Sequence, residues 1–152
     1  MSINDLLESI VNKFQIIMEH KKYELVIDII NDVGMIRCDK KAVQQTVLNI
    51  LENAYKYSLD KNKIPWIKLS ARTKKNQLLI SIHDKGIGME KKYLSKIFKH
   101  FYRIENIDGI LSKGTGLGLA IVKFFILKHK GKIIVQSSFK TGSRFDIYLP
   151  LK

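Results

Sequence analysis

Residues 114–121 read Gly114-Thr115-Gly116-Leu117-Gly118-Leu119-Ala120-Ile121, three alternating glycines followed directly by an apolar helical segment. This pattern predicts a flexible loop that runs into the N-terminus of a helix, where backbone N–H groups and the positive end of the helix dipole have no partners. Such a junction suits phosphate binding. Glycines before a helix also serve as ordinary turn residues, so the assignment depends on the rest of the chain.

Three familiar nucleotide-binding signatures are excluded. No glycine cluster ends in the Gly-Lys-Ser/Thr of a P-loop, and the glycine spacing at 114–118 differs from that of the dinucleotide fingerprint. The catalytic-loop signature of Ser/Thr/Tyr protein kinases is missing as well.

Length and composition predict one domain over residues 1–152. The 152 residues are 45% hydrophobic, enough to build a core without disulfides or a structural metal. The single cysteine, Cys38, excludes an intrachain disulfide and is consistent with a reducing compartment. No apolar run reaches the roughly 18 to 20 residues that span a bilayer, so we expect a soluble segment without membrane contact.

The formal net charge of +13 favours anionic partners, among them nucleotide phosphates, nucleic acid and acidic proteins. The lysines are dispersed along the chain in pairs such as Lys21-Lys22 and Lys74-Lys75, which is typical of a solvated basic surface. A basic nucleic-acid-binding module is the alternative from another functional class. It lacks support from a basic stripe interleaved with aromatic residues or from a helix-turn-helix signature.

Hydrophobic periodicity predicts an α+β fold. Helices are expected at 3–20, 39–58, 90–101 and 117–130, and strands at 23–30, 66–72, 77–83, 132–138 and 143–149. The pairs 66–72 with 77–83 and 132–138 with 143–149 are hairpin candidates. This order favours a two-layer α/β sandwich, with a mixed, mainly antiparallel sheet and a layer of about three helices on one side.

The helix at 39–58 carries an unusual polar face. Asn49, Glu52, Asn53 and Lys56 lie opposite its apolar stripe. A solvated face explains polarity in general, but such faces are usually built from lysine and glutamate, whereas asparagines lower helix propensity. An asparagine carbonyl is a hard oxygen ligand suited to Mg²⁺, and a lysine one turn later can meet a phosphate.

The sequence Asp84-Lys85-Gly86-Ile87-Gly88-Met89 follows a predicted strand directly. A carboxylate at the end of a buried strand can accept a hydrogen bond from the exocyclic amine of adenine, and glycines let a flat ring approach the backbone. A common strand-ending turn is the alternative explanation.

Taken together, these segments resemble the catalytic and ATP-binding domain of bacterial sensor histidine kinases. Residues 49–57, 84–88, 97–103 and 114–119 look like the N, G1, F and G2 boxes of that family, in the family's order, and Gly142-Ser143-Arg144-Phe145 resembles its last glycine motif. The resemblance covers nearly the whole chain and implies the Bergerat ATP-binding fold, shared with gyrase, the Hsp90 chaperone and the MutL repair protein.

The resemblance also implies roles for individual residues. Asn53 would hold Mg²⁺, Asp84 would read adenine, Gly86 and Gly88 would line the base pocket, and residues 103–115 would form a mobile lid over ATP. Catalytic roles would fall to Asn49, Lys56 and Arg103. The nucleotide-binding set would comprise Asn49, Asn53, Lys56, Tyr57, Asp84, Gly86, Gly88, Met89, Phe101, Lys113, Gly114, Thr115, Gly116, Leu117, Gly118, Leu119 and Ser143.

One position bears on the reaction. Hydrolytic members of the superfamily carry a glutamate one turn before the Mg²⁺ asparagine, and here that place is Asn49, whose carboxamide cannot act as a general base. We therefore expect weak ATP hydrolysis and phosphoryl transfer to an imidazole. Glu52 is acidic and close in sequence, and a solvent-facing salt bridge is the role we expect for it.

None of the four histidines, His20, His83, His100 and His129, resembles the family's phosphoacceptor. The resemblance thus implies a separate histidine-containing dimerisation domain, in the same parent chain or in trans, and a response regulator receiver domain as further partner. The helix at 1–20, through Ile3, Leu7 and Ile10, would adjoin the dimerisation domain, and packing of these residues in the core of this domain is the alternative that we favour. The isolated domain would be monomeric and cytoplasmic. Its parent would be a homodimer, and anchoring of that parent in the inner membrane is left open. An anti-sigma-type serine kinase or a switch ATPase is the alternative within the fold.

Overall fold

The computed structural model describes residues 1–30, 34–99 and 118–151. Five strands form one mixed sheet in the order β1-β2-β3-β5-β4. The strands are β1 (Glu24–Ile29), β2 (Trp66–Lys74), β3 (Gln77–Asp84), β4 (Lys132–Ser138) and β5 (Gly142–Pro150). Only β1 and β2 pair in parallel, while the other three pairs are antiparallel.

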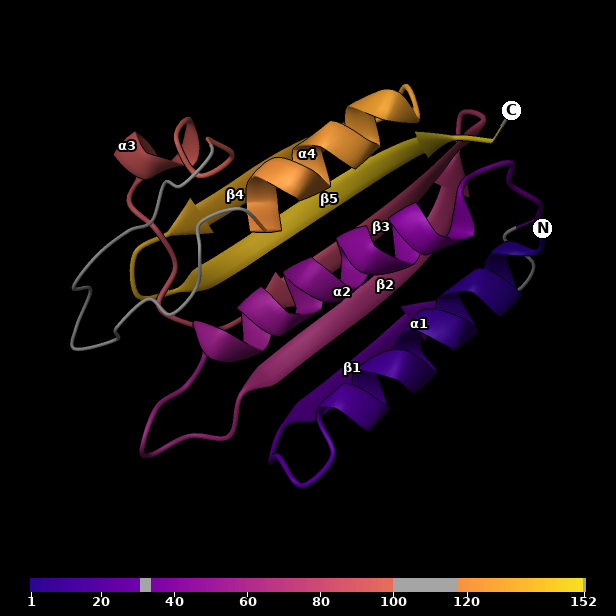
Figure 1. Ribbon diagram of the computed structural model, residues 1–152. Helices are drawn as coiled ribbons and strands as arrows, with labels where there is room; N and C mark the ends of the chain where they lie inside the picture. Colours follow the sequence, from indigo (N-terminus) through magenta and orange to yellow (C-terminus); the bar gives the residue numbers. More distant parts are fainter. Residues whose placement is uncertain (31–33, 100–117, 152) are drawn as a thin grey trace.

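Helices α1 (Ile3–Ile17), α2 (Lys40–Lys56) and α4 (Gly118–Lys128) lie side by side across one face of this sheet (Figure 1). The short α3 (Lys91–Leu94) lies near the end of β4. The expected α+β sandwich with a mainly antiparallel sheet and a single helix layer is therefore confirmed.

Local sequence signals explain where the helices and the first hairpin begin and end. Ser2 and Asp39 cap α1 and α2, their side chains accepting hydrogen bonds from the backbone N–H groups of Asp5 and Ala42. Lys75 and Asn76 connect β2 to β3 with φ values of 49° and 61°. Two consecutive positive φ angles define the tight turn whose twist matches a hairpin, so the loop is shorter than the four residues expected.

The helix expected at 90–101 is confirmed only at Lys91–Leu94 and is wrong for residues 95–99, while 100–101 lie outside the described residues. Helical geometry ends at Leu94, and the N–H groups of Lys96 and Ile97 both bond to the carbonyl of Tyr93 in successive turns. Ser95 is a weaker helix former than its neighbours, and Ile97 is 4% exposed in the core. Burial of that side chain thus outweighs continuation of the helix.

The core lies between the helix layer and the sheet. Its largest fully buried side chains come from α1, α2, β2 and β3 and include Phe14, Leu51, Leu69 and Ile80. On α2, the apolar residues predicted to share a face are buried, whereas Glu52 is exposed and Asn49 and Asn53 are half-buried. This arrangement leaves the polar stripe of α2 accessible on its C-terminal half.

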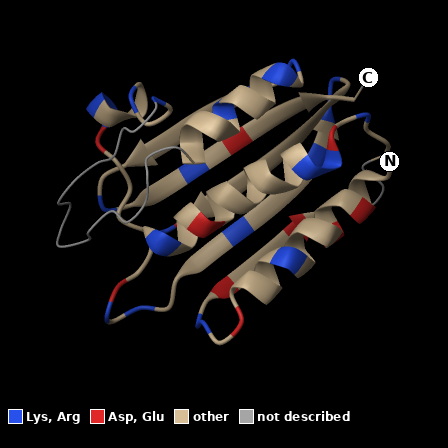
Figure 2. Cartoon of the chain, in the orientation of Figure 1, with Lys and Arg blue, Asp and Glu red and all other residues tan. Residues whose placement is uncertain are grey.

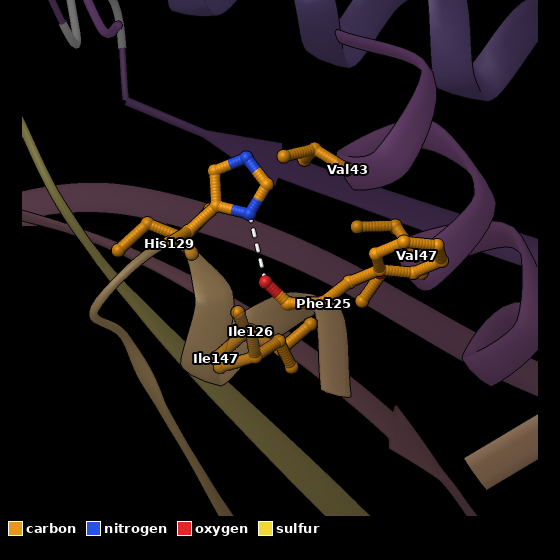
Figure 3. A pocket seen from close by; sticks show the side chains of 8 residues that line it. Val43, Val47, Phe125, Ile126, His129 and Ile147 are labelled. Atoms are coloured by element: carbon orange, nitrogen blue, oxygen red, sulfur yellow. Dashed lines mark hydrogen bonds between the residues drawn. The ribbon is translucent and has the colours of Figure 1, made fainter. Parts of the chain in front are cut away.

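A small apolar cavity interrupts the packing between α2, α4 and β5 (Figure 3). Thr46 lines it with a buried hydroxyl that has no hydrogen-bond partner among the described residues. His129 closes one end: its Nδ1–H donates to the carbonyl of Phe125 at 2.7 Å, and its Nε2 accepts the backbone N–H of Asp39 at 3.0 Å. The neutral imidazole therefore ties the end of α4 to the start of α2.

Lysine and arginine residues are spread over helices, strands and loops of the described chain (Figure 2). The expected dispersal of positive charge is thus seen in space as well as in sequence. Among the helices that the structure describes, none combines the length and apolar character that crossing a membrane requires.

Candidate nucleotide-binding site

Asp84 lies at the C-terminal end of β3, on the sheet face that carries the helices, and is 4% exposed. Its Oδ1 accepts two backbone hydrogen bonds, from the N–H of Gly86 at 2.9 Å and from that of Ser143 at 3.3 Å. Its other carboxylate oxygen has no hydrogen bond within the described chain. The backbone therefore fixes one oxygen and leaves the second able to accept a ligand proton.

Burial raises the pKa of Asp84 to about 6, against the opposing effect of the two backbone hydrogen bonds from Gly86 and Ser143. No cation is among the groups that shift it. At pH 7 and above the carboxylate is ionised and incompletely satisfied, a state that costs stability unless a ligand donates to it.

Three glycines after β3 and at the start of β5, which we call the glycine wall (Gly86, Gly88 and Gly142), lie so close to neighbouring backbone atoms that a side chain is excluded. A Cβ on Gly86 would lie 2.4 Å from the carbonyl oxygen of Tyr57, and one on Gly142 would lie 2.1 Å from that of Asp84. Gly88 and Gly142 also have positive φ angles of 65° and 116°. Only glycine permits both the conformation and the close approach.

Backbone hydrogen bonds connect this wall to the end of α2. The N–H of Ile87 donates to the carbonyl of Tyr57 at 3.1 Å, and the N–H of Tyr57 donates to that of Asn53 at 2.9 Å. On the other side, the N–H of Lys140 donates to the carbonyl of Ile87. These hydrogen bonds connect the end of β3 to the β4–β5 hairpin and to the last turn of α2. Asn53 and Asp84 therefore lie on elements that are held together through the backbone.

The two asparagines of α2 differ in availability. The carbonyl of Asn49 accepts a hydrogen bond from the side-chain amide of Gln45 at 2.9 Å. The carboxamide of Asn53, one turn closer to the glycine wall, has no hydrogen bond within the described chain. Lys56 follows in the last turn of α2, with its Nζ 5.5 Å from the centre of the Tyr57 ring.

The salt bridge expected for Glu52 is not formed. Glu52 is exposed and makes no ion pair with any described residue. The side chain is one position before Asn53, and solvation alone satisfies it.

Within the described ranges, no group of three or more His, Cys, Asp or Glu side chains could hold a metal ion. A cation at this site would therefore depend on the open carboxamide oxygen of Asn53 and on anionic groups of its own ligand. An amide oxygen with phosphate oxygens and water is a donor set that Mg²⁺ accepts. The residues present thus fit Mg²⁺ bound together with a nucleotide.

Ser143 sits beside Asp84, but its hydroxyl is already engaged. Its Oγ lies 2.8 Å from the Oγ of Ser137, which also donates to the carbonyl of Gly142 at 3.0 Å and accepts the N–H of Met89 at 2.7 Å. Sequence reasoning missed Ser137 because a serine within a strand gives no signal. It also missed Ser58, a buried hydroxyl directly after Tyr57.

Gly118 and Leu119 form the start of α4, where Leu119 packs against the core and a Cβ on Gly118 would meet open space. The other predicted site residues lie outside the described residues: Phe101, Arg103, Lys113, Gly114, Thr115, Gly116 and Leu117, and with them the expected lid at 103–115.

The described histidines do not present an obvious phosphoacceptor. His129 uses both ring nitrogens, and burial together with Arg144, Lys85 and Lys68 lowers the pKa of His83. His20 sits in a turn with a positive φ of 68°. His100 lies outside the described residues.

Comparison with known proteins places these features in a family. The family model for histidine kinase-, DNA gyrase B- and HSP90-like ATPases matches residues 38–152. The sensor protein RprX of Bacteroides fragilis is 33% identical over 153 residues, covering 99% of this chain and 29% of the relative. The sensor histidine kinase WalK of Bacillus subtilis is 34% identical over 117 residues, covering 77% of this chain and 19% of the relative. The chain thus spans less than a third of the length of these relatives.

Solved structures share the fold. The nucleotide-free catalytic domain of histidine kinase ThkA superposes with a TM-score of 0.82 at 22% identity, covering 99% of this chain and 95% of that one. Full-length ShkA, solved in complex with AMPPNP, gives a TM-score of 0.81 at 23% identity, covering 99% of this chain and 30% of that one.

Proposed function

The chain belongs to the family of histidine kinase-, DNA gyrase B- and HSP90-like ATPases, and from this premise we propose that it binds ATP with Mg²⁺ and transfers the γ-phosphoryl group to a histidine on a separate dimerisation domain. The whole chain, residues 1–152, would act as one catalytic and ATP-binding domain. The observation that carries the proposal is the open carboxylate oxygen of Asp84, buried beside the glycine wall.

Asp84 recognises the base in this proposal. Its backbone-held Oδ1 fixes the side chain, and the second oxygen accepts a hydrogen from the exocyclic amine of adenine. A guanine presents a carbonyl at the same place, which repels the carboxylate, so the site discriminates between the two bases. The glycine wall, with Met89 beyond it, gives the flat ring a side-chain-free surface.

Asn53 holds the metal and Lys56 meets the phosphates. Bound Mg²⁺ would supply charge stabilisation for the transferring phosphoryl group. Tyr57 flanks the nucleotide, while Gly118 and Leu119 begin the helix that faces it. Arg103, Lys113, Gly114 and Thr115 complete the proposed site as parts of a lid at 103–115, with Phe101 before it and Gly116 and Leu117 after it.

Asn49 determines the reaction type. Its side-chain carbonyl accepts a hydrogen bond from Gln45, and a carboxamide is too weak a base to deprotonate water. Glu52, exposed and unpaired among described residues, is the remaining acidic group on this face. We therefore propose transfer to an acceptor imidazole with little hydrolysis, and a substantial ATPase activity that Glu52→Gln removes would contradict this.

The partners follow from the same proposal. They are a histidine-containing dimerisation domain, in the same parent chain or in trans, and a response regulator receiver domain, with the parent a homodimer and this domain monomeric in the cytoplasm. An anti-sigma-type serine kinase or switch ATPase is the alternative within the fold. An acid-labile phosphohistidine distinguishes the first reading from an acid-stable phosphoserine.

Calorimetric titration with ATP, with and without Mg²⁺, tests the site. In Asn53→Ala we expect the gain in affinity from Mg²⁺ to fall by at least about tenfold, because the only open carboxamide of the stripe is lost. Asn62→Ala, an exposed asparagine in the loop after α2, serves as the matched control and should behave as the parent chain does.

A second arm tests transfer itself. The chain is mixed with radiolabelled ATP and a histidine-containing dimerisation domain from a sensor kinase, and the label on that domain should be acid-labile. An unchanged Mg²⁺ effect in Asn53→Ala, or tighter salt-dependent binding to DNA than to Mg-ATP, would refute the proposal and favour a nucleic-acid-binding module.

A further inference from the structure

Ser58, one residue after the C-terminal cap of α2, carries a buried hydroxyl without a use in the fold. It is 8% exposed, and its Oγ has no hydrogen-bond partner among the described residues. An unsatisfied buried hydroxyl costs roughly 1 to 3 kcal/mol, so its retention beside a candidate site points to a ligand that satisfies it.

The position of this hydroxyl ties it to Asp84. A Cβ built on Gly86 would lie 2.8 Å from Ser58 Oγ, so the hydroxyl sits directly over the open side of Gly86. The N–H of the same glycine donates to Asp84 Oδ1 at 2.9 Å. Two unsatisfied polar groups, a carboxylate oxygen and a hydroxyl, therefore flank one residue that has no side chain.

The hydroxyl protons of Ser137 and Ser143 are both used within the protein, so a ligand that needs a hydroxyl donor must find it elsewhere. Ser137 has one hydroxyl proton and donates it to the carbonyl of Gly142, which can only accept. In the 2.8 Å contact between the two serines, Ser143 is therefore the donor. Ser143 consequently has no proton left for a ligand, whereas the proton of Ser58 is uncommitted.

Adenine presents an amine donor at N6 and an acceptor at N1 on the same edge. Asp84 supplies the acceptor for N6 in the proposed function, and N1 then requires a donor. We propose that Ser58 is a second base-recognition residue, whose hydroxyl donates toward N1 of adenine, directly or through one bound water. This inference rests on the proposed nucleotide site.

The pairing gives the site two contacts with the edge of the base. Guanine carries a carbonyl at position 6, which places an acceptor against the carboxylate of Asp84. The hydroxyl of Ser58 can rotate to accept the N1–H of guanine, so discrimination between the two bases rests on Asp84. Gly86 makes the reading possible, because any side chain there would fill the space in front of Ser58.

The test compares ATP with 1-deaza-ATP, in which C–H replaces N1, by calorimetric titration. The parent chain should bind ATP about tenfold more tightly than the analogue, the usual loss when a buried donor is left unpaired. Ser58→Ala should weaken ATP binding by about that factor and leave the affinity for 1-deaza-ATP unchanged, so that the preference disappears.

Ser81→Ala is the matched control. Ser81 is also a buried serine, but its hydroxyl donates to Asp146 at 2.6 Å on the opposite face of the sheet, so the preference for ATP should persist. If Ser58→Ala does not fold, Ser58→Cys, a near-isosteric and weaker donor, should reduce the preference by a smaller factor.

The outcomes distinguish the role of Ser58 from nucleotide binding itself. Equal affinities of the parent chain for ATP and 1-deaza-ATP, or equal loss of both in Ser58→Ala, overturn the role of Ser58 while nucleotide binding stands. Binding of neither nucleotide by the folded parent chain overturns the proposed function, and the role of Ser58 with it.

Discussion

Replacing Asp84 by asparagine should make the ligand-free chain more stable, although it removes the group that reads the base. Burial raises the pKa of this carboxyl from 3.8 to about 6. A carboxyl whose folded-state pKa is raised favours folding below its unfolded pKa, and that contribution is lost as pH rises through the folded value. The ionised Asp84 therefore destabilises the fold at neutral pH.

The magnitude follows from the two pKa values. A difference of about two units corresponds to about 3 kcal/mol at pH 8, to about half of that at pH 5, and to little at pH 4. An asparagine carbonyl at this position still accepts the N–H groups of Gly86 and Ser143 and carries no charge. We expect Asp84→Asn to gain up to that amount at pH 8, with the gain shrinking as pH falls.

Urea unfolding followed by far-UV circular dichroism between pH 4.5 and 8 measures the difference, provided that the slope with urea is shared. Asp146→Asn is the contrasting variant, since that buried carboxylate is paired with Arg144 at 2.9 Å and with Ser81, and its loss should destabilise. A variant Asp84→Asn that is less stable than the parent at pH 8, or a gain that does not change with pH, would show that the ionised carboxylate does not destabilise the fold. Nucleotide titration of the same variant should show weaker ATP binding and reduced preference for adenine over guanine.

Two further predictions concern packing. Gly142→Ala should destabilise the fold by more than about 3 kcal/mol, because its Cβ would overlap the backbone of Asp84 at a positive φ. Gly34→Ala, at φ +88° but in open space, should cost only about 1 kcal/mol. Thermal melting measures both, and similar losses in the two variants would contradict the account of the glycine wall. Thr46→Val should raise the free energy of unfolding by about 1 kcal/mol, because it removes from an apolar cavity a buried hydroxyl that has no partner among the described residues. In Thr141→Val, the hydroxyl that is lost is exposed and hydrogen-bonded, so urea unfolding should show no gain. A loss of stability in Thr46→Val would mean that its hydroxyl is satisfied.

The sequence predicted those parts of the fold whose local signals agree with their tertiary environment. The amphipathic pattern of α2 and the cap residue Asp39 place that helix within one or two residues of its observed bounds. The alternating strands likewise predicted the two hairpin pairs, β2 with β3 and β4 with β5, but not the pairing of β3 with β5. The end of α3 could not be predicted, because burial of Ile97, a long-range effect, decides where the chain leaves the helix.

The sequence predicted those site residues whose type and spacing indicate a function. It did not predict residues that matter only because of where the fold places them. Asp84 and the glycines are recognisable from a strand followed by an Asp-x-Gly-x-Gly pattern, and the asparagine stripe from helical spacing. Ser58 and Ser137 gave no such signal, since a serine after a helix or within a strand is common. Their importance depends on which hydrogen-bond partners the fold leaves to them, and only coordinates show this.

The surface that surrounds Asp84 is made of main chain: peptide units of the end of β3, the β4–β5 hairpin and the last turn of α2 touch where no side chain intervenes. These peptide units lose their conformational freedom when the chain folds, so binding a ligand against them costs little additional conformational entropy. Substitutions at neighbouring positions can alter charge and polarity around Asp84 without changing the course of this backbone. Its contour is inherited with the fold itself.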